Sequence, residues 1–227
     1  MLTRWDDLPE DMRVPEVRPY YDILKKKTVS LFVKRLFDIT LSLLLIIVLA
    51  LPMMVIALLI KTDSEGPVMY RQERVTRNGR VFRIHKFRTM VQNADKIGTA
   101  VTVGNDPRIT RVGNRLRKVR LDELPQLFDV LVGDMSFVGT RPEAVKYVNE
   151  YLPQYKATLL LPAGITSEAS LRFKDEDSML EGSEDPDRTY IEDILPQKMK
   201  YNLEALNNLS LVSELKTMIR TVFAVMK

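Results

Sequence analysis

ITLSLLLIIVLALPMMVIALLI, residues 39–60, decides the fold, because 22 consecutive uncharged residues are long enough to cross a bilayer as a helix. Pro52 lies past the middle of this run, where its ring removes a backbone donor and kinks a helix. Basic residues flank the run on both sides: Lys25, Lys26, Lys27, Lys34 and Arg35 before it, and Lys61, Arg71, Arg74 and Arg77 after it. Cytoplasmic loops concentrate such residues, so the flanks favour a re-entrant helix broken at Pro52, with both ends in the cytoplasm. A single kinked span remains the alternative.

Composition limits the other possibilities. A chain of 227 residues can form one domain with a core, plus an anchor. The formal charge of +4 is compatible with an anionic membrane face, a phosphorylated substrate or nucleic acid. The absence of cysteine excludes disulfides and thiolate metal sites, and it is typical of a reducing compartment. No secretory signal is expected, because no small-residue cleavage site accompanies the first apolar run.

The rest of the chain predicts a mainly helical α+β fold. Residues 1–30 form a polar N-terminal extension, 31–61 the membrane helix and 62–227 a cytoplasmic domain. Two β-prone runs around Asn78 and Gly79 predict a small hairpin within 67–88, with strands near 67–75 and 81–88. The spacing in 121–132 predicts a helix that begins with Asp122 as its N-cap and has Pro125 in its first turn. Further helical patterns cover about 142–158 and 187–206.

Three segments have less certain roles in the sequence. The extension, broken by prolines, is expected to pack on the domain or on another subunit. The acidic stretch 174–187 is typical of a solvated loop. The C-terminal stretch 210–227 places apolar residues on one helical side, which suits either a helix on a membrane surface or a stripe packed on the core. That stripe consists of Leu211, Leu215, Met218, Ile219, Val222 and Met226.

An adjacent carboxylate pair, Asp122 and Glu123, lies among basic residues. The cations nearby in sequence are Lys86, Arg88, Arg108, Arg111, Arg115, Arg117, Lys118, Arg120 and Arg141. Arginine forks bind phosphate oxygens bidentately, so this cluster is a candidate phosphate site, with Lys86 and Arg88 closing the second strand. Beside these cations both carboxylates can stay ionised, and an ionised carboxylate can bind Mg²⁺ or attack phosphorus. The pair alone is more typical of an ordinary helix start, where Asp122 caps the helix and Glu123 favours its dipole.

Several spaced motifs resolve that ambiguity. They are KRLFD at 34–38, KFRTM at 86–90, DPRITRVGNRLR at 106–117 and RLDELPQLFDVLVGDMSFVGTRPE at 120–143. In this order they resemble the bacterial sugar transferases, and more narrowly the minimal form of the monotopic polyprenyl-phosphate phosphoglycosyltransferases. The resemblance covers about 30–166, and again, weakly, the C-terminal stretch. It also implies the re-entrant helix broken at Pro52, with surface helices at the membrane interface.

The resemblance implies an enzyme that transfers a sugar 1-phosphate from a UDP-sugar to undecaprenyl phosphate and releases UMP. Such enzymes catalyse the first membrane step of polysaccharide or glycoconjugate synthesis, and Mg²⁺ is the expected cofactor. Asp122 matches the nucleophile that forms a covalent phosphosugar intermediate and also binds the metal, while Glu123 matches the residue that assists the acceptor phosphate. Lys86, Arg117 and Arg141 match the phosphate-binding positions. Residues 62–227 would be the catalytic domain, facing the cytoplasm from the bacterial inner membrane.

The remaining expectations concern partners and departures. Nucleic acid is not an expected partner, and a homodimer is possible. Thr140 and Asp129 replace the family's usual Pro and Asn, and SEASLRFKDED after Thr166 replaces a segment that ends in Asn-Gly-Arg in relatives. This difference leaves sugar recognition open. The rival interpretation is a membrane-anchored basic binding or scaffold protein without catalysis. That rival does not explain why carboxylates lie inside the basic cluster.

Overall fold

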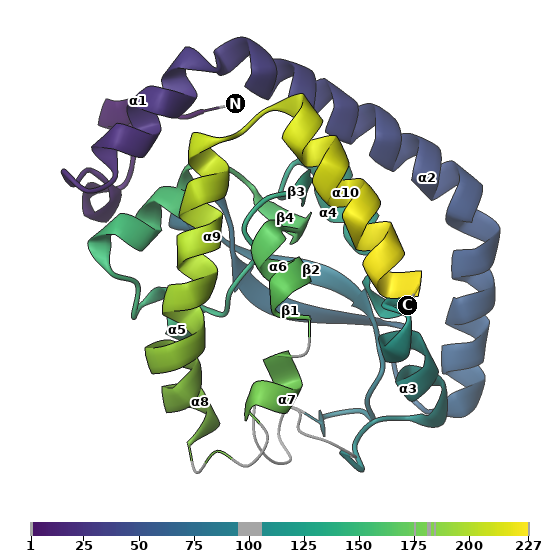
Figure 1. Ribbon diagram of the computed structural model, residues 1–227. Coiled ribbons are helices and arrows are strands. Elements are labelled where there is room, and N and C mark those ends of the chain that lie inside the picture. Colours follow the sequence, from purple (N-terminus) through teal and green to yellow (C-terminus); the bar gives the residue numbers. More distant parts are fainter. Residues whose placement is uncertain (1, 95–105, 175, 181–182, 184, 227) are drawn as a thin grey trace.

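The computed structural model describes residues 2–94, 106–174, 176–180, 183 and 185–226. Helices dominate it, as the sequence predicts, and the strands form a two-stranded antiparallel sheet and a two-stranded parallel sheet. One helix, α2 (Thr28–Asp63), is long and apolar enough to cross a membrane among the described residues. Figure 1 shows α2 as an arch around one side of the molecule, with the other elements inside it.

Helix α2 passes through Pro52 without a break, over 36 residues. The expectation of a helix broken at Pro52 is therefore corrected to a helix that bends, and Figure 1 shows its two halves running in different directions. Proline removes one backbone hydrogen bond and crowds the preceding turn. The helix bends to relieve this crowding, and its remaining hydrogen bonds continue on both sides.

Both ends of α2 are attached to the same domain. Near its start, the Arg35 guanidinium donates to the carbonyls of Val130 and Leu131, at 2.6 and 2.8 Å. At its end, the Asp63 carboxylate accepts a hydrogen bond of 2.9 Å from the Val112 backbone N–H. The two termini of the apolar helix are thus held against one body.

The outer face of α2 is apolar and exposed, whereas its inner face packs on the domain. The exposed residues are Val29, Phe32, Val33, Leu36, Leu43, Leu44, Ile47, Val48, Leu51, Met54, Val55, Leu58 and Leu59. Met53, Ile56 and Ile60 are buried on the other face, next to Phe87 and Leu116. An apolar strip of this length is unusual for a surface in contact with water.

Strands β1 (Met69–Val75) and β2 (Val81–Phe87) confirm the predicted hairpin. Asn78 and Gly79 form its turn with φ of 58° and 71°, the left-handed conformation that Asn-Gly favours. Register places Arg74 opposite Phe82 and Tyr70 opposite Lys86, so Arg74 and Lys86 share one face of the hairpin.

The carboxylate pair lies in a 3₁₀ turn, Leu121–Glu123, between α3 (Arg111–Lys118) and α4 (Gln126–Val132). Arg120 precedes the turn in the left-handed region, at φ 52°. The predicted N-cap role of Asp122 is wrong, because α4 starts four residues later and Pro125 occupies its N-cap position. The tight turn moves both carboxylates off the helix and toward the face of the β-hairpin.

A short parallel pair joins β3 (Met135–Val138) to β4 (Ala163–Thr166), which the sequence analysis did not predict. Gly139 and Gly164 cross here at close range. A Cβ placed on Gly164 would lie 2.2 Å from the backbone nitrogen of Gly139 and 2.3 Å from its carbonyl oxygen. Only glycine allows the two chains to approach this closely.

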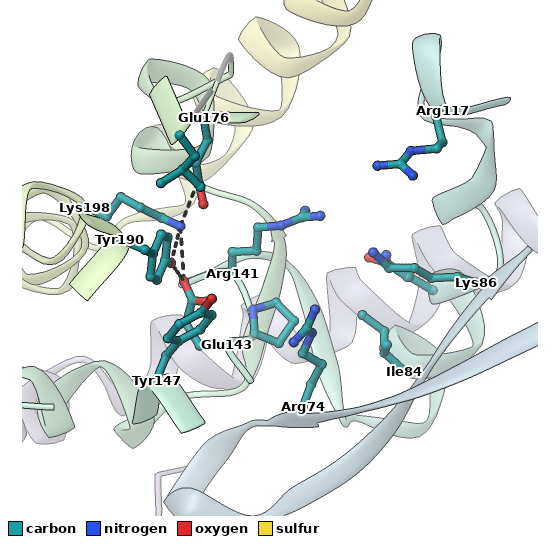
Figure 2. A pocket seen from close by; sticks show the side chains of 13 residues that line it. Arg74, Ile84, Lys86, Arg117, Arg141, Glu143, Tyr147, Glu176, Tyr190 and Lys198 are labelled. Carbon is teal, nitrogen blue, oxygen red and sulfur yellow. Dashed lines mark hydrogen bonds and ion pairs between the residues drawn. The ribbon is translucent and has the colours of Figure 1, made fainter. Parts of the chain in front are cut away.

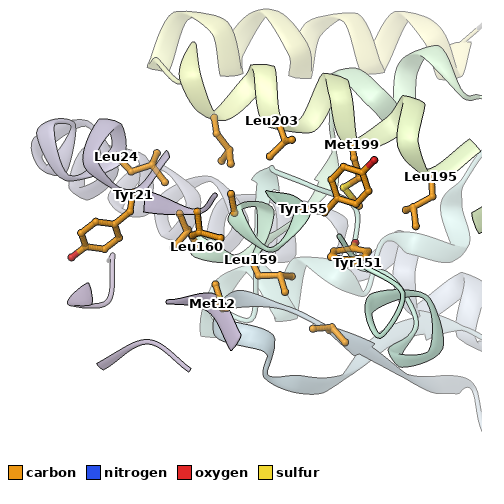
Figure 3. Close-up of a cluster of buried hydrophobic side chains, with 14 of the residues drawn as sticks. Met12, Tyr21, Leu24, Tyr151, Tyr155, Leu159, Leu160, Leu195, Met199 and Leu203 are labelled. Atoms are coloured by element: carbon orange, nitrogen blue, oxygen red, sulfur yellow. The ribbon is translucent and has the colours of Figure 1, made fainter. Parts of the chain in front are cut away.

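The N-terminal residues pack on the domain. Helix α1 (Arg18–Lys26) contributes Tyr21 and Leu24 to a cluster that also contains residues of α9 (Leu195–Asn207) and of the 3₁₀ segment Pro153–Leu160 (Figure 3). The helix predicted over 142–158 is shorter, with α5 (Val145–Val148) followed by that 3₁₀ segment. The helix predicted over 187–206 appears as α8 (Pro186–Thr189), a π turn over Tyr190–Ile194, and α9.

Two segments complete the fold. Helix α6 (Glu168–Arg172) precedes the acidic stretch, which itself contains a short helix, α7 (Glu176–Leu180), whose Leu180 is buried, so part of the predicted loop is ordered. Helix α10 (Leu211–Met226) covers the region predicted to be amphipathic, and its buried Glu214 pairs with Lys34 of α2 at 2.8 Å. Its outer face exposes Val212, Leu215, Ile219, Val222 and Phe223. Met218 packs inward, and the side chain of Met226 lies outside the described part.

Candidate active site

A cavity of about 210 Å³ lies between the hairpin, α3, α4 and the segments that carry α7 and α9. Arg74, Lys86, Arg117 and Arg141 line one side of it, and Figure 2 shows their side chains directed toward a common space. The structure therefore brings together Lys86, Arg117 and Arg141, which come from three separate motifs. Four cations around one cavity form a site for a polyanion such as a diphosphate.

Glu123 is the anionic anchor of these cations. Its carboxylate accepts a 2.6 Å hydrogen bond from Arg141 and lies 3.4 Å from the Lys86 ammonium and 3.8 Å from Arg120. Burial acts to raise the pKa of Glu123, but Arg141 and Lys86 outweigh it and hold that pKa well below its usual range. The same pairing raises the pKa of Arg141. Glu123 is thus ionised and fixes the positions of two phosphate-binding candidates.

Asp122 has a different environment from its neighbour. Among the residues that the structure describes, it takes part in no ion pair of the kind that holds Glu123. Burial and then the Glu123 charge raise the pKa of Asp122, and the positive charges of Lys86 and Arg117 offset this only in part. The nearby cations therefore lower the pKa of Glu123, whereas at Asp122 they only partly offset the effect of burial. A cation brought against Asp122 would favour its charged form.

Arg88 is not brought into this cavity. Its buried guanidinium donates to the carbonyls of Pro67, at 2.6 Å, Ser64, at 2.8 Å, and Glu65. The strand ends at Phe87, so the side chain of Arg88 turns toward the end of α2 rather than continuing along the face that carries Lys86. The predicted phosphate-binding residue thus holds the chain that leaves the apolar helix α2.

Arg74 was missed in the sequence analysis, although a signal was present. With a turn at Asn78 and Gly79, Arg74 falls on the same face of the hairpin as Lys86. Burial lowers the pKa of Arg74, and Arg141 adds to this effect, whereas Glu143 opposes it. This crowding of positive charge would be relieved by a bound anion.

The wall opposite the cations is built from carboxylates and phenols. Lys198 donates to Glu143 at 3.1 Å, Glu176 at 3.0 Å and the Tyr190 hydroxyl at 2.7 Å, and Tyr147 lines the cavity beside them (Figure 2). These residues are far apart in the sequence, so no local pattern predicted the network. The wall adds hydrogen-bond acceptors to a cavity whose other side has mainly donors.

The carboxylates present suit a metal ion that takes most of its ligands from substrate phosphates and water rather than from the protein. In the described part of the chain, no group of three or more acidic or histidine side chains could enclose an ion. Asp122 and Glu123 are adjacent, and Mg²⁺ is commonly bound by one or two carboxylates together with substrate phosphates and water. His85, the only histidine, is 2.6 Å from the buried Asp129 through Nδ1 and so joins β2 to α4. It is a structural residue.

Comparison with known proteins identifies the family to which these motifs belong. The family model described as bacterial sugar transferase matches residues 29–227. The UDP-glucose:undecaprenyl-phosphate glucose-1-phosphate transferase of Escherichia coli is 36% identical over 94% of this chain and 44% of its own length. A UDP-N-acetylgalactosamine-undecaprenyl-phosphate N-acetylgalactosaminephosphotransferase of Aeromonas hydrophila is 43% identical over 62% of this chain and 34% of its own.

A shorter relative matches over most of its length. The putative undecaprenyl-phosphate N-acetylgalactosaminyl 1-phosphate transferase of Bacillus subtilis is 43% identical over 56% of this chain and 72% of its own length. The chain spans less than half the length of the Escherichia coli and Aeromonas relatives. The family match nevertheless covers almost all of the apolar helix α2, the carboxylate turn and the cationic cavity, so the chain belongs to the bacterial sugar transferase family.

Proposed function

We propose that this protein transfers a sugar 1-phosphate from a UDP-sugar to undecaprenyl phosphate and releases UMP, as an initiating step of polysaccharide or glycoconjugate synthesis. One observation carries the proposal. Four cations line one side of a cavity, and Glu123 of the carboxylate pair binds two of them, on a domain that carries a long exposed apolar helix. The cavity suits a diphosphate, and the helix suits a lipid acceptor. Relatives whose names state this class of reaction support it.

In the proposed reaction, an Asp122 oxygen attacks the β-phosphorus of the UDP-sugar, and the bond between that phosphorus and the bridging oxygen breaks. UMP leaves with the bridging oxygen, and the sugar phosphate stays on Asp122 as an acyl phosphate. A phosphate oxygen of the acceptor then attacks the same phosphorus and frees the carboxylate, which yields a polyprenyl diphosphate sugar. A carboxylate nucleophile divides one displacement into two steps of lower barrier.

The other residues have roles that follow from their contacts. Lys86, Arg117 and Arg141 would bind the diphosphate and stabilise the charge on the oxygens as the bridge breaks. Arg74 extends this cation ring. Glu123 keeps Lys86 and Arg141 in place and lies beside the carboxylate that the acceptor phosphate must approach. These contacts would together hold the β-phosphorus in position for attack by Asp122.

Mg²⁺ is proposed as the cofactor, with Asp122 as its protein ligand. When bound, the ion would neutralise charge on the diphosphate and on the departing UMP. Asp122 suits this role because no ion pair among the described residues occupies its carboxylate, and a bound cation would offset the burial and the Glu123 charge that raise its pKa. The nearby cationic side chains alone do not fully offset the effects that raise the pKa of Asp122.

The membrane arrangement is also a proposal. We place the outer faces of α2 and α10 in the cytoplasmic leaflet, with α2 entering at its start, bending at Pro52 and returning. Attachment of both helix ends to one domain supports this arrangement over a single span. The catalytic domain would then face the cytoplasm, and the lipid phosphate would meet Asp122 at headgroup depth. In bacteria this membrane is the inner membrane.

Two single cysteines test this topology, because the natural chain has none. We expect Lys26→Cys and Glu65→Cys, which are exposed positions at the two ends of α2, to react with a membrane-impermeant maleimide only in inside-out vesicles. Leu51→Cys, exposed beside the bend, should react in neither orientation because it would lie within lipid. Labelling of the first two positions from opposite sides would show that α2 spans the membrane.

The proposed activity is tested by incubating the purified protein with Mg²⁺, undecaprenyl phosphate and a panel of UDP-sugars while UMP is measured. We expect repeated turnover to UMP with at least one UDP-sugar, and only when undecaprenyl phosphate is present. A membrane-anchored binding protein would produce no UMP with any sugar, even though it would still associate with anionic vesicles. This result would favour the scaffold interpretation.

A further inference from the structure

Gln126, the first residue of α4, combines burial with an unused amide. Its side chain lines the cavity and is only 1% exposed. Neither Oε1 nor Nε2 has a hydrogen-bond partner among the residues that the structure describes. Because both amide atoms are unpaired, the observation holds whichever way the amide is oriented.

An unpaired buried amide is unfavourable for the folded protein. Removing a polar group from water without a new hydrogen bond costs free energy, and an apolar residue of similar shape avoids that penalty. Lys198, on the opposite wall, is also buried but is paired with Glu143, Glu176 and Tyr190. A residue that lowers stability inside a binding cavity is typical of a contact that forms only with a ligand.

The chemistry of the cavity indicates which part of a ligand this amide contacts. Lys86, Arg117 and Arg141 are donors only, so they match phosphate oxygens. The carbonyl oxygen of Gln126 instead needs a donor, which an ionised phosphate lacks and a hydroxyl provides. A hydroxyl can also accept from Nε2, so one such group or two neighbouring ones would satisfy the whole amide. Glu143 and Glu176 on the far wall are further acceptors for hydroxyls.

We propose that Gln126 is a substrate-binding residue that hydrogen-bonds a hydroxyl of the sugar carried on the transferred phosphate. The assignment rests on the proposed function. It favours the sugar over the nucleoside because Gln126 follows Asp122 by only four residues, at the helix start that comes directly after the carboxylate turn, and Asp122 attacks the phosphorus that bears the sugar. The nucleoside is the other source of a donor, and the experiment separates the two.

The test is Gln126→Met, which keeps an unbranched side chain of similar length and removes the amide. We expect the melting temperature to stay the same or rise by about 2–4 °C, because an unsatisfied buried group is lost. We expect kcat/KM for the preferred UDP-sugar to fall about tenfold or more, because a sugar hydroxyl then faces an apolar side chain. The affinity for UDP without a sugar, measured as competitive inhibition, should change less than about twofold.

Gln197→Met is the matched control, since Gln197 is exposed on α9 and donates only to a backbone carbonyl of the preceding turn. It should leave both kinetic measurements unchanged. A fall in the melting temperature of Gln126→Met would show that the amide is part of the folded structure, and this would overturn the inference. Equal loss of UDP and UDP-sugar affinity would assign the contact to the nucleotide and would overturn it as well. If the unsubstituted protein forms no UMP from any sugar, the proposed function itself fails, and that outcome is distinct from both.

Discussion

Asp122→Asn should abolish lipid-dependent UMP formation while leaving the protein folded. An amide oxygen is neither an effective nucleophile toward phosphorus nor a strong ligand for Mg²⁺, so the substitution removes both proposed roles. Loss of a covalent nucleophile reduces turnover by about 10⁴-fold or more. The fold should survive because Asn has nearly the same shape and Asp122 forms no ion pair in the described part of the chain. Turnover is measured as UMP release, and folding as the melting temperature.

Asp193→Asn is the matched control for this experiment. It makes the same atomic change on an exposed acid and should leave the activity unaltered. If Asp122→Asn retained more than a small fraction of the turnover, the carboxylate would not be the nucleophile. Glu123 could not then be assumed to replace it, since Arg141 and Lys86 already hold that side chain.

Gly164→Ala is expected to destabilise the protein more than an ordinary surface substitution would. The added Cβ would meet the backbone nitrogen of Gly139 at 2.2 Å, so one of the two chains must move. Gly139 follows β3 and lies two residues before Arg141, which means that the movement would disturb both the parallel pairing and the cation ring. Backbone clashes of this kind belong to the severe class, about 4 kcal/mol or more. For a chain of this size we expect the melting temperature to fall by about 10 °C or more.

Gly79→Ala provides the comparison, because its Cβ would meet nothing within 4 Å although φ is +71°. Left-handed strain alone costs about 1 kcal/mol. A melting temperature for Gly164→Ala as high as that of Gly79→Ala would mean that the β3–β4 crossing can open without loss. The tight approach of Gly139 to Gly164 would then have no structural importance.

The sequence predicted the parts of the fold that local patterns determine. The Asn78-Gly79 turn sets the hairpin, and an uncharged run sets a long apolar helix, so both were identified, although the predicted break at Pro52 is a bend. The parallel pair β3–β4 was missed because its strands have four residues each and depend on a glycine crossing distant in sequence. The supposed cap at Asp122 failed because Arg120 adopts a left-handed conformation and moves the helix start to Gln126.

In the candidate site, too, local motifs predicted some residues, whereas contacts between distant segments determined the others. Lys86, Arg117 and Arg141 came from motifs and meet in the cavity, whereas Arg88 shares the strand parity of Lys86 but lies beyond the last paired residue. The alternation of side chains along a strand does not show at which residue the strand ends. The Lys198 network joins residues up to 55 positions apart, so only the folded chain reveals it. Unpaired amide groups such as that of Gln126 are likewise visible only after packing is known.

A single-turnover experiment without acceptor lipid tests the central claim most directly. The protein is mixed with Mg²⁺ and its preferred UDP-sugar, UMP is quantified, and the intact protein and its peptides are weighed by mass spectrometry. The covalent mechanism predicts a burst of UMP close to one equivalent and a sugar phosphate attached at Asp122, which disappears when undecaprenyl phosphate is added. UMP that forms only after the lipid is present, with no mass added to the protein, would show direct transfer between the two substrates and would contradict the account.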